Sequence, residues 1–470
     1  MEPEHIRFGG GLAETFLHPL VAVWMLIAIV LLLVLPRHKA IAPFLLTFFT
    51  IPLGQVIVAG GVHFTVQHIL VLTVLARMAF FRVSSSDRRF AGGFNALDKL
   101  VVLWTVSGFL VVSLQWMNTQ ALIKFLGDLL DGLGGYLAVR FLIPDRDAVR
   151  RTIKVLAAIC VIQGICMVSE QFTLRNVFGF LGVGSPEMRE GHVRSQGVMG
   201  ALYGGVFAGV LIPLFLWMWT EGKSRMAACA GLCGATAMVI ASHASTSLSA
   251  YGASLVALGF WPLRKQMRLA RWGLVAILVG LHLVMNGPVW SLIEHIDLTG
   301  GSSGYHRYLL IDTLIRHFGD WWLLGTRNNG SWGWQMWDTC NEFVAIAVTG
   351  GLLTLALYIM ILKRSFAAIG NARKQVSGDR RQEWFLWCLG SCLFANVIAQ
   401  FGINYMVHLL FVFFPLLAFI SFVTFESRRA GPEARSWTRR IWRLHPALPG
   451  SICRSAKQCE THGKAFSSGI

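Results

Sequence analysis

Charged residues are scarce in this sequence. Asp, Glu, Lys and Arg account for 14% of its 470 residues, whereas about 25% is typical of soluble globular proteins. Apolar residues account for 55%, and the mean hydropathy is +0.58. This composition excludes an ordinary soluble domain and predicts an integral membrane protein.

Acidic residues are the rarer of the charged types, with 24 Asp and Glu against 41 Lys and Arg and a net charge of +17. A basic surplus can indicate nucleic-acid binding, but its distribution here argues against that partner. If the turn at 36–40 is cytoplasmic and the apolar runs alternate from there, few basic residues fall outside, namely Arg7, Arg175, Arg189, Arg194, Arg307, Arg316 and Arg327. The positive-inside rule then predicts an external N-terminus and a cytoplasmic C-terminus.

The sequence also lacks a disulfide framework and an internal repeat. Most of the nine cysteines lie within apolar runs, where they are typical of small apolar filling rather than of a metal site. No repeat period emerges, which favours one integral domain over a transporter built from two matching halves.

Long apolar runs dominate what is present. A helix of roughly 20 apolar residues crosses the hydrocarbon layer, and about thirteen runs approach that length. They lie near residues 15–35, 41–60, 64–82, 99–117, 121–143, 152–172, 197–219, 226–243, 246–263, 272–286, 341–362, 384–403 and 406–425. We expect an all-α polytopic membrane helix bundle over 15–425, an external segment at 1–14, and a basic, disordered cytoplasmic tail at 426–470.

Two predicted outer loops, 173–196 and 287–340, interrupt the apolar pattern. The first ends in His192 and Arg194, which we place immediately before a helix. A guanidinium beside a helix N-terminus suits a pyrophosphate, because the guanidinium donates two parallel hydrogen bonds and the helix end is positive. A surface arginine at the lipid headgroups is the alternative interpretation.

The longer loop is predicted to contain an amphipathic helix at 305–318. Apolar residues recur there at helical spacing, and Ser302 or Ser303 could cap the helix; the apolar positions are Ile311, Leu314, Ile315 and Phe318. Arg307 would lie in the first turn, near free N–H groups that favour phosphate binding.

Several other polar positions allow two interpretations each. Trp332 and Trp334, near Arg327, could form a sugar platform or an interfacial tryptophan belt. Ser247, in the Ser-rich turn 243–249, could bind a sugar or phosphate oxygen or cap a helix.

Charges inside or beside the apolar runs are also ambiguous. Lys124, Asp128 and Asp131 are predicted to share one helix face. They allow two interpretations, a neutralised Lys124–Asp128 pair that faces the bundle interior, or a proton or substrate path. The Asp145-Arg146-Asp147 motif favours a helix cap over a metal site.

The order of these features resembles the O-antigen ligase and polymerase superfamily over approximately residues 190–362. The similar pieces are Arg194 ahead of a run, the Ser-rich turn, SSGYHRYLLIDTL at 302–314, the Leu324-Gly325 turn, and Asp338-Thr-Cys-Asn341 leading into Glu342 and Gly350-Gly351. Cys340 occupies the position at which ligases of this family typically have histidine.

The resemblance implies transfer of a glycan from a polyprenyl diphosphate to an acceptor hydroxyl at the outer face of a bacterial inner membrane, without metal or other cofactor. Arg194 and Arg307 would hold the diphosphate. We expect Asp338 as the base, with His306 and Glu342 as further candidates, and we assign substrate contacts to His192, Arg327, Asn341, Glu342, Trp332, Trp334 and Ser247. Expected partners are the lipid-linked oligosaccharide, a glycan or lipid acceptor, membrane lipids and other polysaccharide assembly proteins, but no nucleic acid.

Two functions of other classes stay open at this point. A transporter or flippase for the same lipid-linked oligosaccharide would place charges along a path through the bundle, and only the Lys124 group fits that pattern. A non-catalytic component of a polysaccharide assembly complex is the second, because the histidine of the family pattern is absent at Cys340.

Overall fold

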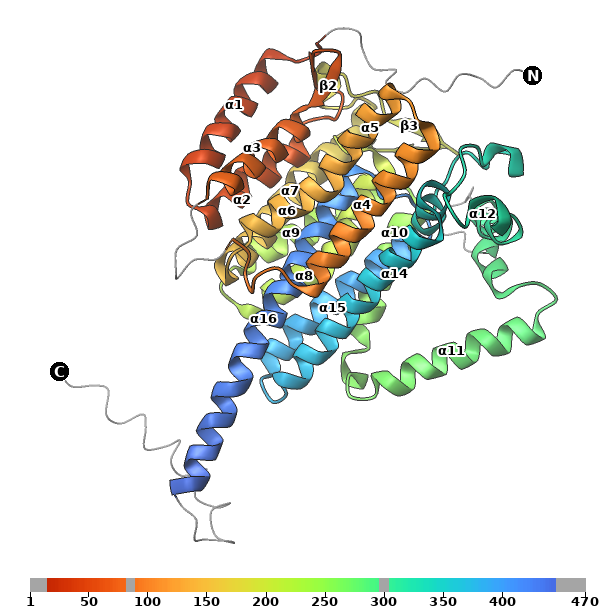
Figure 1. Cartoon of the computed structure of the whole chain (residues 1–470). Helices are drawn as coiled ribbons and strands as arrows, with labels where there is room; N and C mark the ends of the chain where they lie inside the picture. Colours follow the sequence, from red (N-terminus) through yellow and green to blue (C-terminus); the bar gives the residue numbers. More distant parts are fainter. Residues whose placement is uncertain (1–14, 82–88, 296–303, 445–470) are drawn as a thin grey trace.

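The structure is a computed structural model that describes residues 15–81, 89–295 and 304–444. Within those ranges the chain is all-α apart from two small β-hairpins (Figure 1). The helices over the apolar runs are α1 (Pro19–Val34), α2 (Arg37–Thr50), α3 (Val66–Phe80), α4 (Ala96–Trp116), α5 (Thr119–Leu129), α6 (Gly135–Leu142), α7 (Arg146–Thr173), α8 (Ala201–Glu221), α9 (Arg225–Ala241), α10 (Ser245–Gly259), α11 (Met267–Val284), α14 (Glu342–Gln375), α15 (Arg380–Gln400) and α16 (Val407–Leu444).

Every predicted apolar run therefore contains helix. The number of helices long enough to cross a membrane is smaller than the number of predicted runs. Within the described ranges, six helices are long and apolar enough to cross a membrane, namely α4, α7, α8, α11, α14 and the 407–426 part of α16. Helices α1, α3 and α9 are apolar but shorter. These lengths support a multi-pass membrane protein, while the count of thirteen crossings stays a prediction.

Small residues bring α7 and α9 into close contact. A Cβ atom added to Gly164 of α7 would lie 2.8 Å from the carbonyl oxygen of Gly234 on α9, and one added to Gly234 would lie 2.7 Å from the carbonyl oxygen of Cys160. In a membrane, helix association depends on such close packing because lipid tails are as apolar as the side chains. The pair forms part of the bundle that supports the outer loops.

Aromatic packing joins α2 to α16 in the interior. The rings of Phe48 and Phe411 stack with centroids 3.8 Å apart, and Phe44 and Phe414 also contact Phe411. All four side chains are fully buried. Offset aromatic contacts of this kind add about 0.5–1.5 kcal/mol beyond the burial of apolar area, so they fix how the first helices pack on the last.

The interhelical connections gather at two ends of the bundle, as strict alternation of helix direction predicts. At one end the guanidinium of Arg140 and the hydroxyl of Tyr136 both donate to the Asp98 carboxylate, at 3.2 and 2.5 Å, and all three groups are buried. Arg264 pairs with Glu383 at the same end. The opposite end holds the two predicted outer loops, which we call the loop end.

The structure corrects three predicted boundaries. Residues 121–143 do not form one regular helix, because a π-helical turn at Leu130–Gly134 separates α5 from α6. Residues 56–65 form the hairpin β1 (Val56–Ala59) and β2 (Val62–Thr65) instead of continuing the apolar helices. Helix α16 continues to Leu444, so the first part of the predicted tail is helical; 1–14 and 445–470 lie outside the described residues.

Helix α11 is the least integrated of the long helices. It lies apart from the bundle in Figure 1, and none of its residues is buried. Its apolar surface is compatible with lipid contact. The helix leads directly into the long loop that carries most of the candidate site.

Candidate functional site

The first outer loop folds into a hairpin. Strand β3 (Glu187–Arg189) pairs antiparallel with β4 (His192–Arg194) around a two-residue turn in which Glu190 and Gly191 both have positive φ, at 51° and 80°. This is the turn geometry that favours tight hairpins. The prediction that His192 and Arg194 stand immediately before a helix is therefore wrong, because α8 begins only at Ala201.

Polar side chains at the end of α7 hold this hairpin in place. The amide of Gln171 donates to the carbonyl oxygens of Val193 and Ala241, at 2.8 and 2.9 Å. The buried carboxylate of Glu170 accepts hydrogen bonds from the backbone of Gln196 and Gly197, at 2.7 and 2.9 Å. Because these contacts fix backbone atoms, β4 has a defined position over the α9–α10 turn.

Arg194 is mostly buried despite its outer position. Its guanidinium lies 3.4 Å from the exposed carboxylate of Glu187, and 12% of the side chain is accessible. Its Nε is buried and has no hydrogen-bond partner. Burial lowers the pKa of Arg194, because removing the charge from water is unfavourable and, among the described carboxylates, the exposed Glu187 is the one that offsets it.

The α9–α10 turn connects the hairpin to the long loop. The rings of His192 and His243 stack with centroids 5.0 Å apart and planes 8° from parallel. Burial lowers the pKa of His243, and the charges of His192 and Arg194 act in the same direction. Three residues further on, the hydroxyl of Thr246 accepts a 2.9 Å hydrogen bond from Arg307.

Arg307 lies in the first turn of α12 (Gly304–Arg316), as predicted. The buried Leu310 and Leu314 follow it by three and seven residues, so all three share the face that contacts the bundle. This differs from the predicted apolar face, since Ile315 and Phe318 are exposed. The proposed caps Ser302 and Ser303 lie outside the described residues.

The Arg307 side chain is only partly satisfied. One terminal nitrogen donates to Thr246, while Nε is buried without a partner, and no ion pair with a carboxylate is found for it within the described chain. Burial lowers the pKa of Arg307; the neighbouring Cys340 acts in the opposite direction, and the charge of Arg189 on β3 acts in the same direction as burial. The hairpin and α12 therefore bring positive charges together at the loop end.

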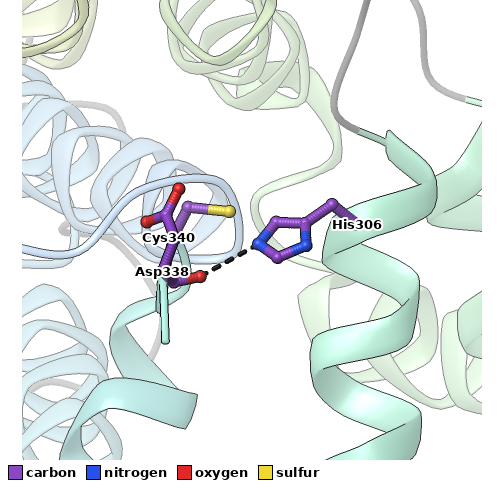
Figure 2. A group of neighbouring side chains, drawn as sticks. All are labelled: His306, Asp338 and Cys340. Carbon is purple, nitrogen blue, oxygen red and sulfur yellow. Dashed lines mark hydrogen bonds between the residues drawn. The ribbon is translucent and has the colours of Figure 1, made fainter. Parts of the chain in front are cut away.

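The side chains of His306, Asp338 and Cys340 converge in what we call the His306 cluster (Figure 2), and the Arg307 charge lies near Cys340. The ligand atoms of His306, Asp338 and Cys340 all lie within 4.8 Å of one another. The His306 ring is 2.9 Å from the backbone carbonyl oxygen of Asp338, whose side chain is exposed. Burial raises the pKa of the half-buried Cys340 thiol to about 11, although the nearby Arg307 charge acts to lower it.

The next two predicted residues secure the start of α14. The Asn341 side chain caps the helix by accepting from the backbone of Phe343, at 3.0 Å, and donates to the carbonyl oxygen of Phe401. Glu342 is buried and accepts a 2.7 Å hydrogen bond from the backbone of Tyr405. Both side chains therefore have structural partners around the start of α14.

The other predicted residues of the long loop, Arg327, Trp332 and Trp334, make no described contact with the His306 cluster. Arg327 donates to the carbonyl oxygen of Gln115 and lies over the ring of Trp116 at the end of α4. Trp332 stacks on the His317 ring with centroids 5.1 Å apart, whereas Trp334 is 80% exposed. No described contact connects these three residues to Arg307, and the choice between sugar platform and membrane belt stays a prediction.

Between these regions the loop enters a break in α14. Gly351 leaves helical geometry with φ 70° and ψ −175°. The carbonyl oxygen of Val348 accepts from Thr326, at 2.7 Å, and the amide of Leu352 donates to Trp322, at 2.9 Å. Broken helices in membranes need partners for their freed backbone groups; here Trp322 and Thr326, which follow the short helix α13 (Phe318–Trp321), supply them.

Three further predictions are located by the structure. Ser247 is fully buried and points toward Gly205 of α8 rather than to the loop-end surface. Lys124 pairs with Asp128 at 2.6 Å, as expected, but both side chains are about half exposed, so the predicted location facing the bundle interior is wrong. Asp131, predicted on the same face, is buried and lies 3.3 Å from His68. Asp145 caps α7 by accepting from the backbone of Ala148, so the capping interpretation is confirmed.

Sequence reasoning missed Thr246 and His243 as individual site residues. Both lie in the Ser-rich turn that was singled out, but helical periodicity does not show which hydroxyl faces α12. Arg189 was recognised only as one of the scarce outer arginines. One signal could have indicated that Arg189 lies near Arg194: the two residues are five positions apart, with Glu190-Gly191 between them, and this is compatible with a tight hairpin.

Comparison of the whole sequence with models of known protein families finds no match, and no curated protein matches it.

Proposed function

We propose that this protein is a membrane glycan transferase that moves a polyprenyl-diphosphate-linked glycan onto an acceptor hydroxyl. The observation that carries the proposal is the pair of largely buried guanidinium groups, Arg194 and Arg307, on two sides of the α9–α10 turn. Each has a buried Nε without a hydrogen-bond partner. Buried cations are costly unless paired, so an anionic ligand such as a diphosphate would offset that cost.

The arginines would act by stabilising the leaving group. In a single displacement, the acceptor oxygen attacks the anomeric carbon while the bond from that carbon to the diphosphate oxygen breaks. The bonding electron pair leaves with the diphosphate, whose growing negative charge Arg194 and Arg307 would bind. Such electrostatic stabilisation is usually the largest catalytic contribution, and inversion at the anomeric carbon follows from the geometry.

A base must take the proton of the acceptor hydroxyl. Asp338 is the residue we propose, because its carboxylate is exposed beside the Arg307 region. His306 is the second candidate at the same place. Glu342 is less suited, since its carboxylate is buried and bound to the backbone of Tyr405. General base catalysis of this kind contributes about 10²–10⁴-fold.

The proposed location is a bacterial inner membrane, with about thirteen crossings, an external N-terminus and a cytoplasmic C-terminus. Its support is the charge distribution along the sequence: when the apolar runs alternate, few Lys and Arg residues fall in the segments on the side of the candidate site. The positive-inside rule then turns the loop end outward. A lipid-linked glycan presented at the outer face would reach Arg194 and Arg307 there.

The function is tested by replacing the arginines in cells that depend on the protein. Arg194→Met and Arg307→Met, expressed at the normal level, should remove long surface polysaccharide chains. Retention of single repeat units would identify a polymerase, whereas long chains left on the lipid carrier would identify a ligase. Unchanged chain length and attachment in both variants would refute the site.

A purified system separates transfer from transport. In sealed vesicles, the protein should form a new glycosidic bond between a lipid-linked oligosaccharide and its acceptor. Movement of the oligosaccharide across the bilayer without a new bond would instead favour a flippase. No reaction with the purified protein, restored only by other assembly proteins, would favour a non-catalytic component.

A further inference from the structure

We propose that His306, Asp338 and Cys340 form a binding site for a thiophilic divalent cation, Zn²⁺ being the best fit. The three side chains come from the first turn of α12 and from the segment just before α14, and they converge as Figure 2 shows. Their ligand atoms lie within 4.8 Å of one another. This departs from the sequence-based expectation of a site without metal.

The ligand set is the one that zinc prefers. Zinc binds thiolate, imidazole and carboxylate at about 2.0–2.3 Å in tetrahedral geometry, which places ligand atoms roughly 3.3–3.8 Å apart. The longest separation between ligand atoms therefore needs to shrink by about 1–1.5 Å. Asp338 is exposed and can turn, and the His306 ring needs only to exchange its contact with a backbone carbonyl for the ion.

Charge balance also favours occupation of this cluster. A thiolate from Cys340 and a carboxylate from Asp338 would neutralise a divalent ion, since a coordinating thiol loses its proton. The neighbouring guanidinium of Arg307 would then face a neutral complex rather than an added positive charge. Cys340 is a free, half-buried thiol, which limits access by bulkier reactants.

Three protein ligands leave the fourth tetrahedral position open. That arrangement is typical of zinc sites that accept water or another oxygen ligand. The ion would also cross-link α12 to the start of α14, which are joined in sequence by the loop that carries α13 and the tryptophans. If the proposed transfer function holds, zinc should inhibit it, because the ion occupies both candidate bases.

Cobalt(II) provides the test, because a thiolate ligand and tetrahedral geometry each give a distinct absorption band. The purified full-length protein in detergent, with Cys453 and Cys459 of the tail changed to serine, is titrated with cobalt and then with zinc. We expect one cobalt ion per chain with a thiolate charge-transfer band that zinc abolishes. Binding is measured directly, so the result does not depend on glycan transfer.

Variants then assign the ligands. Cys340→Ser should abolish the thiolate band. Loss of a residue that only supports a metal ligand lowers metal affinity by about 10–100-fold, and His306→Ala, which removes a ligand itself, should lower the affinity for cobalt by more than that. Cys166→Ser, which changes another half-buried free thiol on α7, is the matched control and should leave the spectrum unchanged. Absence of a cobalt band, or a band that survives in Cys340→Ser, would overturn the proposal.

Discussion

Replacing Arg307 should separate function from stability. The change Arg307→Met removes a cation that no described carboxylate pairs with, while the apolar side chain retains much of the volume. Because burying a charge without a partner costs free energy, we expect the thermal unfolding temperature of the variant to stay equal or to rise. Turnover of a diphosphate-linked donor should fall in the same protein.

The size of the loss follows from the hydrogen-bonding groups. Arg307 uses one terminal nitrogen on Thr246, at 2.9 Å, and leaves Nε without a partner. A hydrogen bond to a charged group contributes about 1.5–3 kcal/mol, which corresponds to about 10–150-fold in rate at about 1.36 kcal/mol per tenfold. Arg307→Met should therefore lower kcat/KM by at least about 10-fold. Arg307→Lys should lower it less, because it keeps the charge but not the planar guanidinium.

The matched control is Arg316→Met on the same helix. Arg316 is 73% exposed and pairs with Asp312 at 2.7 Å, so it tests loss of an arginine from α12 without loss of the proposed site. Its turnover should stay close to that of the unmodified protein. If Arg307→Met retained full turnover at equal protein amount, or if both variants lost it equally, the assignment of Arg307 to the diphosphate would be refuted.

Three more predictions concern stability and reactivity. Asp98→Asn leaves the fully buried Arg140 without a counter-charge and should destabilise the fold by about 3–5 kcal/mol in denaturant unfolding, whereas the double change with Arg140→Met should recover most of that loss. Gly325→Ala places a Cβ 2.2 Å from a backbone oxygen at φ 68° and should lower the unfolding temperature, whereas Gly319→Ala, with open space around it, should not. In protein freed of bound metal, alkylation of Cys340 should accelerate about tenfold per pH unit toward the thiol pKa of about 11.

Each of these has an outcome that contradicts it. An equally unstable double variant would show that Asp98 acts through its other hydrogen bonds and not through charge. Gly325→Ala at wild-type stability would mean that the turn does not pack into the break of α14. An alkylation rate that levels off near pH 8.5 would place Cys340 in an ordinary aqueous environment, contrary to the burial that raises its pKa.

The helices and their alternation could be predicted because both follow from local properties. Apolar run length alone located helix in each predicted run, and the positions of Arg307 in a first turn and Asp145 at a cap followed from short-range spacing. Helix boundaries were less predictable. The π-helical turn at 130–134 and the hairpin at 187–194 depend on packing and backbone turns that composition does not encode.

The candidate site was predicted as a set of residue types rather than as an arrangement. Sequence selected Arg194, Arg307, His306 and Asp338 because outer charges are scarce in this chain. It placed Ser247 with them, although the side chain turns inward to Gly205 and its neighbour Thr246 meets Arg307 instead. One position along a helix rotates a side chain by about 100°, so the contact depends on helix packing.

What the sequence determined by itself is therefore the membrane class, the helical runs and the uneven distribution of charge, since each depends on residues near one another in the chain. The tertiary structure decided that Cys340 meets His306, that the hairpin of Arg194 lies over the α9–α10 turn, and that a turn of the long loop fills the break in α14. These contacts join segments far apart in sequence. They arise because buried backbone and charged groups need partners, wherever the packing of the bundle supplies them.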